Sequence, residues 1–576
     1  MLIANRFRKI NFSEPRFSRD GIIIFIALLP QIIVIWTATI LFTQDGPVHL
    51  YISTILNNLS ESAATSGLND VATYYEENWR IVPNLLGYLI LQPLIKIFGA
   101  ITAEKILVTI YIITLPYAIY FAAKALKAQP LLAVLLSFPL LTTSALYIGF
   151  YNYSFSLVFF VLGLALWVKI ETKEDVSLSS LVCLGIISLL AFVSHAMGFS
   201  ILLLICASGS LIYRFMDFRV FGLSSAARNF IKYTLPIGLC LFPGFLMFVY
   251  FLTQESVHAA QLTLIDQALW GSNEDAPYFF LKSLKNRIIS FLGGEFIFAD
   301  RALRVILVLG LFLMSYAKIR EGNLIPKKGA IAGIPPKDSS PQSLRNIIPW
   351  LLLLLLAVTL LFPPISFNTR FVAERILPFI FLFLVFWLAT YTTLPTFVKI
   401  LIAIIFVVNV AIPLKRIDEL SNTYDKYQEY QFAEQYLAPG KTFMVFNLRN
   451  QKDATRLGFF LHEGKRLALN TGAINLKVIQ ARSPFPVIPI KYIDGKSPFP
   501  SIIETSPSPY LHESINPLVY QEQTSVKIDY LLYWGIQDHK MPTSFKDYFK
   551  TIEADYTLIA TSPGRGMMKI YQLNEP

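Results

Sequence analysis

The sequence predicts a polytopic α-helical membrane protein that ends in a small α/β domain. Over half of its 576 residues are apolar and 15% are charged, whereas a soluble globule carries about 25% charge. The apolar residues also gather in runs close to the ~20 residues that cross a bilayer. These runs stop after Leu414, and the ~160 residues that follow are enough for one soluble domain.

The net charge of +11 does not by itself indicate a nucleic-acid partner. Most of the cations flank apolar runs, where positively charged loops orient a protein in the bilayer. The three cysteines, Cys183, Cys206 and Cys240, all lie in apolar runs, so the tail has no disulfide framework. We therefore expect a lipid bilayer as a partner of this chain, and no nucleic acid.

The chain begins with a basic amino terminus at 1–20, expected in the cytoplasm, followed by an apolar run at Gly21–Phe42. That run is too long for a signal-peptide core and no small-residue cleavage site follows it, which predicts a retained first membrane helix. A polar first external loop occupies 43–80. The apolar segment Val82–Phe98 contains two prolines and a glycine, which favours a broken element lying in the interface.

The predicted membrane domain covers 21–414 and contains about 11–13 membrane helices. Two loops rich in cations, 214–232 and 318–345, are expected in the cytoplasm. Counting helices from these loops places the carboxyl-terminal domain outside. Further apolar runs lie at 106–123, 131–148, 153–168, 181–193, 199–213, 233–252, 303–317, 347–362, 376–389 and 398–414.

The tail at 415–576 mixes strand-like and turn-rich stretches, which indicates a small α/β domain. Three stretches rich in aromatic and aliphatic residues predict strands, at 441–448, 527–535 and 567–573. TRLGFFLHEGK (455–465) predicts a helix. The proline-rich span 483–517 predicts a long surface loop.

Asp45, Gly46, Pro47 and His49 follow the first membrane helix in the stretch DGPVH. Asp is favoured just before a helix whose first turn holds proline, so a helix cap explains the pattern. The same geometry also suits a general base, because an acid at the lip of a membrane cavity can take a proton from an alcohol. His49 lies one turn further along the same face, where it could orient the carboxylate or contact a phosphate.

Three features together resemble the C-type superfamily of membrane glycosyltransferases, which includes the protein O-mannosyltransferases and the aminoarabinose transferases of lipid A. They are the first membrane helix, Asp45 at the start of the first external loop, and the broken apolar element in NWRIVPNLLGYLILQPLIKIFG (78–99). In architecture the resemblance covers about residues 20–415. It implies an enzyme that moves a sugar from a polyprenyl-phosphate donor to an extracytoplasmic glycan, lipid or protein, with Asp45 as its base.

The resemblance implies the bacterial cytoplasmic membrane as the location. Many relatives carry a second acid directly beside the first, but here the neighbour is Gly46. The external membrane loops hold no pair of acids in the D-x-D spacing that binds a metal, and His258, His462, His512 and His539 form no metal-ligand spacing. We therefore predict a reaction that uses no cofactor, with a divalent metal ion as the alternative.

A phosphate donor requires cations at the cavity. Arg370, Glu374 and Arg375 lie at an expected external helix start. Arg370 and Glu374 are four residues apart and could pair with each other, which would leave Arg375 to bind a phosphate. Arg80 is a further candidate for the phosphate. The alternative for the arginines is an interfacial anchor, which for Arg80 would act together with Trp79.

Polar residues at two further external positions could line the substrate cavity. Tyr151 and Asn152 lie where two membrane helices join, and His195 lies at a helix break. Ordinary interface packing explains the same residue types. A different class of function also fits the composition, namely a lipid or polysaccharide transporter or an assembly scaffold. A lipid-to-glycan ligase is a nearer alternative. Convergence of Asp45, His49 and Arg375 on one external cavity would favour the enzyme.

Overall fold

The computed structural model describes residues 19–65, 70–172, 176–254, 341–361, 372–390, 423–447, 459–481, 488–498, 517–535 and 549–574, with a few isolated residues between 396 and 407. Six segments in these ranges are long and apolar enough to cross a membrane. They are α1 (Arg19–Thr37), α4 (Ala100–Ala125), Pro130–Ile148, α7 (Tyr151–Thr172), α9 (Ala196–Phe221) and Leu223–Leu252. The predicted class of integral, polytopic membrane protein is confirmed.

Four further helices contain apolar segments of 10–17 residues within the described ranges. They are α3 (Leu86–Phe98), α8 (Leu178–Ser194), α15 (Pro341–Leu361) and α16 (Val372–Ala389). Because α3 rises about 20 Å, it is too short to cross a hydrocarbon core of about 30 Å. The predicted count of 11–13 spans also includes the runs at 303–317 and 398–414, which lie wholly or largely outside the described residues.

Two of the six segments are made of several elements. Pro130–Ile148 consists of α5 (Pro130–Ser137), a 3₁₀ turn at Phe138–Thr142 and α6 (Ser144–Ile148). Leu223–Leu252 consists of α10 (Leu223–Asn229), a π-helical turn at Phe230–Thr234 and α11 (Leu235–Leu252). At the centre of the bundle, α7 lies against α4, α8 and α9. Nearly every residue of α7 is buried, as expected for a helix that is apolar on all sides.

The tail folds around a five-stranded sheet of order β3-β2-β5-β7-β6. Its strands are β2 (Thr442–Asn447), β3 (Ile474–Asn475), β5 (Tyr530–Trp534), β6 (Tyr556–Thr561) and β7 (Met568–Leu573). β2 is parallel to β3 and β5, whereas β7 is antiparallel to β5 and β6. The three predicted strands and the predicted α/β class are confirmed.

The tail also contains helices α18 (Gly464–Thr471) and α19 (Pro517–Thr524). The helix predicted at 455–465 differs from the structure, in which a 3₁₀ turn at Phe459–Leu461 precedes α18. Gly464 packs closely on β2, and a Cβ there would lie 2.7 Å from Val445 Cγ2, which explains the glycine at this position. The span predicted as a long loop contains β4 (Ile490–Tyr492).

Part of the loop at 43–80 belongs to the folded unit of the tail. Helix α2 (Gly46–Thr65) buries Val48, Ile52 and Ile55 in the same apolar core as strands β2 and β5. Strand β1 (Tyr75–Glu77) pairs in antiparallel fashion with β4. The tail is therefore joined to the membrane bundle by the loop that carries Asp45.

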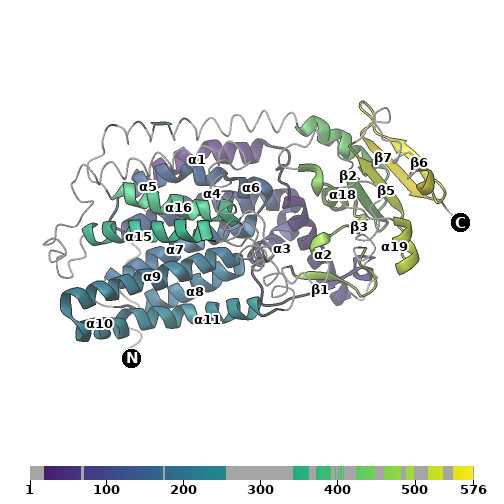
Figure 1. The fold of residues 1–576 in the computed structure, drawn as a ribbon. Coiled ribbons are helices and arrows are strands. Elements are labelled where there is room, and N and C mark those ends of the chain that lie inside the picture. The colour runs from purple at the N-terminus through teal and green to yellow at the C-terminus, as the bar shows by residue number, and fades with distance from the viewer. Residues whose placement is uncertain are drawn as a thin grey trace, which may run out of the picture.

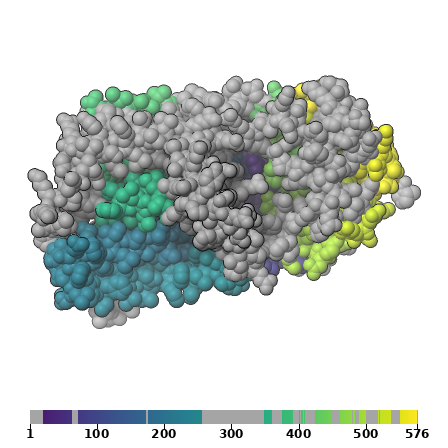
Figure 2. All heavy atoms as spheres, in the orientation of Figure 1, coloured from purple at the N-terminus to yellow at the C-terminus, as the bar shows by residue number. Residues whose placement is uncertain are grey.

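The tail lies at one end of the bundle (Figure 1). Helices α1 and α8 end there, and α7, α9 and α16 begin there, whereas α10 lies at the opposite end. Figure 2 shows the same division on the surface, with helices of 150–250 at one end and the last strands at the other. The ends of these five helices and the loop at 43–80 thus surround one region beneath the tail.

Candidate active site

Asp45 lies in a cavity of about 170 Å³ beneath the tail. It precedes the first residue of α2, and its carbonyl accepts hydrogen bonds from the Val48 and His49 amides, at 3.0 and 3.1 Å. The helix-start position predicted for Asp45 is therefore observed. The residues that line the cavity are Asp45, Val48, His49, Asn84, Tyr88, Phe150, Asn152, Tyr153, His195, Arg375, Gln480 and Ile488.

The backbone around Asp45 is held by the turn that connects α6 to α7. The Asp45 amide donates to the Ile148 carbonyl at 2.7 Å. Gly149 has φ +90°, and a Cβ there would lie 2.7 Å from the Gly46 nitrogen. A Cβ on Gly46 would in turn collide with side-chain oxygens of Glu104 and Thr43. A side chain at position 46 would not fit beside these oxygens, which explains the glycine next to Asp45.

Burial raises the pKa of Asp45 to about 6, against the smaller lowering effects of a hydrogen bond with Gln44 and of the charges of Arg375 and Lys465. An ordinary aspartate has a pKa near 3.8. The carboxyl is therefore a stronger base than a surface aspartate while remaining largely ionised above pH 6. A pKa near the working pH is the property that a general base needs.

Arg375 faces the same cavity from the start of α16. Its guanidinium lies over the Phe150 ring, 4.3 Å from the ring centroid, and the Tyr153 hydroxyl donates to its carbonyl at 2.6 Å. Its Nη1 lies 2.9 Å from Nε2 of His195. A cation over the face of an aromatic ring is attracted by the ring, which favours this position of the guanidinium.

His195 caps the start of α9 and faces donors on both sides of its ring. Nδ1 accepts from the Met197 amide at 3.1 Å, and Nε2 faces Arg375. A neutral imidazole has one acceptor nitrogen, so it cannot accept from both donors. Burial, followed by the Arg375 charge, holds the pKa of His195 well below its usual range. An anion near Nε2 could accept N–H groups from both His195 and Arg375.

Three of the predicted residues have their polar groups engaged within the protein. His49 Nδ1 lies 3.1 Å from the Tyr88 hydroxyl, and burial lowers the pKa of His49 to about 4. Oδ1 of the Asn152 side chain accepts from the Gly87 backbone amide at 2.6 Å, and its Nδ2 donates to the Asn84 carbonyl at 2.9 Å. These contacts fix the approach to α3, as the packing alternative expects.

Tyr151 is the third, and its hydroxyl donates to Glu104 at 2.6 Å. Arg80 is exposed and does not line the cavity, which suits an interfacial anchor. Arg370 and the side chain of Glu374 lie outside the described residues. In the described part of the chain, the structure thus brings together Asp45, His49, Asn152, His195 and Arg375.

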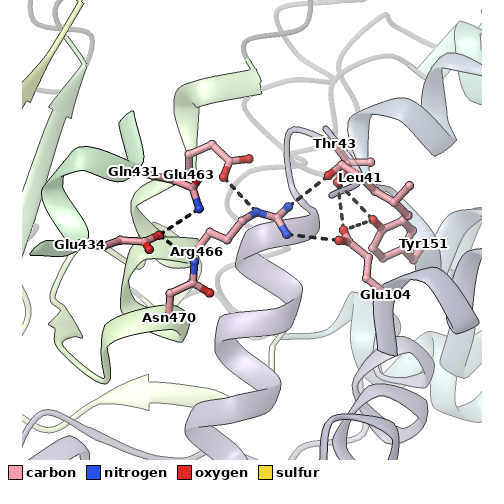
Figure 3. A network of polar contacts seen from close by, with 9 residues as sticks. All are labelled: Leu41, Thr43, Glu104, Tyr151, Gln431, Glu434, Glu463, Arg466 and Asn470. Carbon is pink, nitrogen blue, oxygen red and sulfur yellow. Dashed lines mark hydrogen bonds and ion pairs between the residues drawn. The ribbon is translucent and has the colours of Figure 1, made fainter. Parts of the chain in front are cut away.

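A buried ionic network that sequence reasoning missed links the tail to α4 and to the segment at Leu41 and Thr43 (Figure 3). Arg466 is fully buried; its Nη1 lies 3.5 Å from Glu104 Oε2, and its Nε donates to Glu463 at 3.0 Å. Nη2 donates to the Leu41 carbonyl at 3.1 Å. One guanidinium therefore joins the tail both to α4 and to the segment that leads to Asp45.

The tail also supplies residues to the cavity itself. Gln480 and Ile488 line it, and His462 Nε2 lies 3.6 Å from Asp45 Oδ1. The scattered tail histidines gave no indication of this contact in the sequence. Within the described ranges, no three His, Cys, Asp or Glu side chains are grouped so as to hold a metal ion.

No family model matches the chain, and no curated protein matches it in sequence. Among solved structures it is similar to ArnT from Cupriavidus metallidurans bound to undecaprenyl phosphate. That match has 10% identity and a TM-score of 0.49, and it covers 96% of this chain and 98% of that one. It is also similar to the archaeal oligosaccharyltransferase AglB from Archaeoglobus fulgidus in complex with an inhibitory peptide and a dolichol-phosphate.

The AglB match has 12% identity and a TM-score of 0.42, and it covers 90% of this chain and 70% of that one. Because both TM-scores lie below 0.5, we base the functional proposal on this chain's own residues.

Proposed function

We propose that this chain is an integral-membrane glycosyltransferase that moves a sugar from a polyprenyl-phosphate donor to a hydroxyl group of an acceptor outside the cytoplasm. One observation carries the proposal: the Asp45 carboxyl and the Arg375 guanidinium line the same cavity, where several membrane helices end. A base and a phosphate-binding cation within reach of the bilayer are what this transfer needs. The acceptor could be a glycan, a lipid or a protein.

In the proposed reaction, Asp45 takes the proton of the acceptor hydroxyl. The acceptor oxygen forms a bond to the anomeric carbon, and the bond from that carbon to the phosphate oxygen breaks. The electron pair leaves with the phosphate, whose charge Arg375 and the Nε2–H group of His195 would stabilise. A phosphate is a good leaving group, so one base together with electrostatic stabilisation is sufficient.

The orientation is part of the same proposal. Arg214 and Arg219, near the end of α9, and Arg228 in α10 lie at the end of the bundle away from the tail. By the tendency of basic loops to stay in the cytoplasm, that end faces inward. The cavity and domain 415–576 would then be extracytoplasmic, as in a bacterial cytoplasmic membrane, with the amino terminus inside.

The test uses the full-length protein purified in detergent, a panel of radiolabelled polyprenyl-phosphate sugars, and a membrane extract as the source of acceptor. We expect label to leave the polyprenyl lipid with wild-type protein. Asp45→Asn should lower the rate by about 10²–10⁴-fold, the usual contribution of a general base. Glu553→Gln, which changes an exposed acid of the tail, is the matched control and should leave the rate unchanged.

Unchanged transfer by a folded Asp45→Asn protein would refute the role of Asp45 as base. Absence of binding to every polyprenyl phosphate tested would refute the enzyme, and would favour a transporter or an assembly scaffold.

A further inference from the structure

We propose that His462 of the tail is a positioning residue for Asp45, and that its Nε2–H group holds the carboxyl in the ionised form that the reaction needs. This proposal rests on the proposed function, because it is the transfer reaction that requires an ionised Asp45. The arrangement of His462 around Asp45 can nevertheless be tested without any transfer.

The position of His462 is fixed by the tail. The Asn447 side-chain amide at the end of β2 donates to the carbonyls of Phe460 and Leu461, at 3.1 and 3.2 Å. The His462 carbonyl then accepts from the Lys465 amide at 3.0 Å. Arg466, one residue further along, makes the buried contacts with α4 described above. A residue between two such anchors has little freedom to move away from Asp45.

The proton on His462 can be placed from its neighbours. Lys465 Nζ lies 3.4 Å from Nδ1 of His462. An ammonium group can only donate, so Nδ1 is the acceptor and the ring proton is on Nε2. Nε2 is the atom that lies 3.6 Å from Asp45 Oδ1. The order Lys465, His462, Asp45 therefore has a donor facing an acceptor at each step.

The 3.6 Å separation is slightly longer than a hydrogen bond. Hydrogen bonds of catalytic groups are often long before substrate binds and shorten in the complex. Binding of Oδ1 by His462 would leave Oδ2 of Asp45 to receive the acceptor proton. His462 itself does not become the base, because burial and then the charges of Lys465 and Lys477 hold its pKa well below the usual range.

Several other groups influence the pKa of Asp45, and none of them differs between the wild-type protein and a His462 variant. Arg375 from α16 and Lys465 from α18 favour the ionised carboxyl, Gln44 contributes a hydrogen bond, and burial opposes ionisation. Titratable and charged groups that face Asp45 or His462 from the packed elements are Arg375, Lys465, Lys477, His49 and Tyr88.

The experiment measures the protonation of Asp45 directly. Carbodiimides react with protonated carboxyl groups, so the rate of labelling at Asp45, read by mass spectrometry against pH, reports its titration. The full-length wild-type protein is compared with His462→Ala and His462→Gln. The Gln side chain can place an N–H group near the position of Nε2, whereas Ala cannot. Asp45→Asn shows the background signal of the peptide.

We expect the labelling midpoint to rise by about one pH unit in His462→Ala, which is a tenfold change in the ionisation equilibrium of Asp45. His462→Gln should keep the wild-type midpoint. In the transfer assay, the acidic limb of the pH profile should move with the labelling midpoint, with little change in the KM for the donor.

An unchanged midpoint in His462→Ala would overturn the proposal. Equal shifts in the Ala and Gln variants would also overturn it, because they would indicate loss of packing rather than loss of the N–H group. His462→Phe provides a second variant if His462→Ala does not fold, because its ring fills the space of the imidazole without an N–H group. We expect it to raise the midpoint as His462→Ala does; no shift in any folded variant counts against the proposal.

If labelling shifts as expected and no transfer occurs with any donor, the proposed function fails while the positioning role of His462 stands. If transfer occurs and labelling does not shift, the reverse holds.

Discussion

Arg466→Met should weaken the joint between the tail and the membrane helices. Arg466 is fully buried between two buried carboxylates, with contacts of 3.5 Å to Glu104 and 3.0 Å to Glu463. At an effective dielectric constant of about 20, a pair of charges 3.5 Å apart attracts by about 5 kcal/mol. The substitution leaves two uncompensated carboxylates in the interior. We therefore expect the free energy needed to separate the tail from the membrane helices, the free energy of opening, to fall by about 3–5 kcal/mol.

Limited proteolysis of the tail can measure this loss. When opening and closing are faster than cleavage, the cleavage rate reports the equilibrium between closed and open forms. The cycle compares Arg466→Met, Glu104→Gln and the double variant. Because the uncharged amide that Glu104→Gln introduces needs no cation, the double variant should lose less than the sum of the single losses, with a coupling of at least about 1 kcal/mol.

Arg565→Met is the matched control for that cycle. Arg565 also contacts a glutamate, Glu429, at 3.5 Å, but its side chain is 51% exposed. Solvent screens such a pair, so the control should change the free energy of opening by no more than about 1 kcal/mol. If Arg466→Met costs no more than Arg565→Met, or if the double variant equals the sum of the singles, the buried network is not what holds the joint.

Three further predictions concern the same region. Gly149→Ala should lower stability by about 1–3 kcal/mol in thermal unfolding, because its Cβ would lie 2.7 Å from the Gly46 nitrogen at a φ of +90°; wild-type stability would contradict the packing described here. Burial raises the pKa of Glu463 from 4.5 to about 7. The stability that this raised pKa gives to the closed form is full below pH 4.5 and is lost as the pH rises through 7. Tail proteolysis should therefore accelerate over that range, and a wild-type pH response in Glu463→Gln would assign the effect elsewhere. Arg375→Lys should weaken binding of a polyprenyl phosphate about 10-fold, because lysine loses the planar stacking on Phe150; unchanged affinity in a direct binding measurement would remove Arg375 from the phosphate site.

The sequence predicted well whatever depends on local pattern. The strands at 442–447, 530–534 and 568–573 were predictable because aromatic and aliphatic residues are concentrated between turn residues. Asp45, His195 and Arg375 could be assigned to one side of the membrane because each lies next to the end of an apolar run. Their convergence in one cavity then follows from packing helices whose ends are at the same level.

Contacts between distant parts of the chain could not be predicted in this way. His462 and Arg466 lie in LHEGKR, which has the composition of an ordinary polar turn, and nothing in its pattern identifies residues of α4 or the first loop as partners. Glu104 did carry a signal. It is an acid at the start of an apolar helix, a position where a charge is costly unless it has a buried partner.

Residues that bind their own backbone were hard to distinguish from residues that bind substrate. Asn152 is of a residue type that can bind a sugar, yet its side-chain amide holds the turn before α3. The distinction depends on which backbone groups lack partners after folding, and a sequence pattern does not contain that information.

The pairing of β1 with β4, and the burial of α2 in the core of the tail, have a consequence for biosynthesis. Asp45 is made and placed at the membrane surface early, but the strands that cover α2 begin only at Thr442. Until then, the apolar face of α2 has no partner in the tail. A nascent chain therefore carries an unfinished site for most of its synthesis, and the ribosome must complete the tail before that site can close.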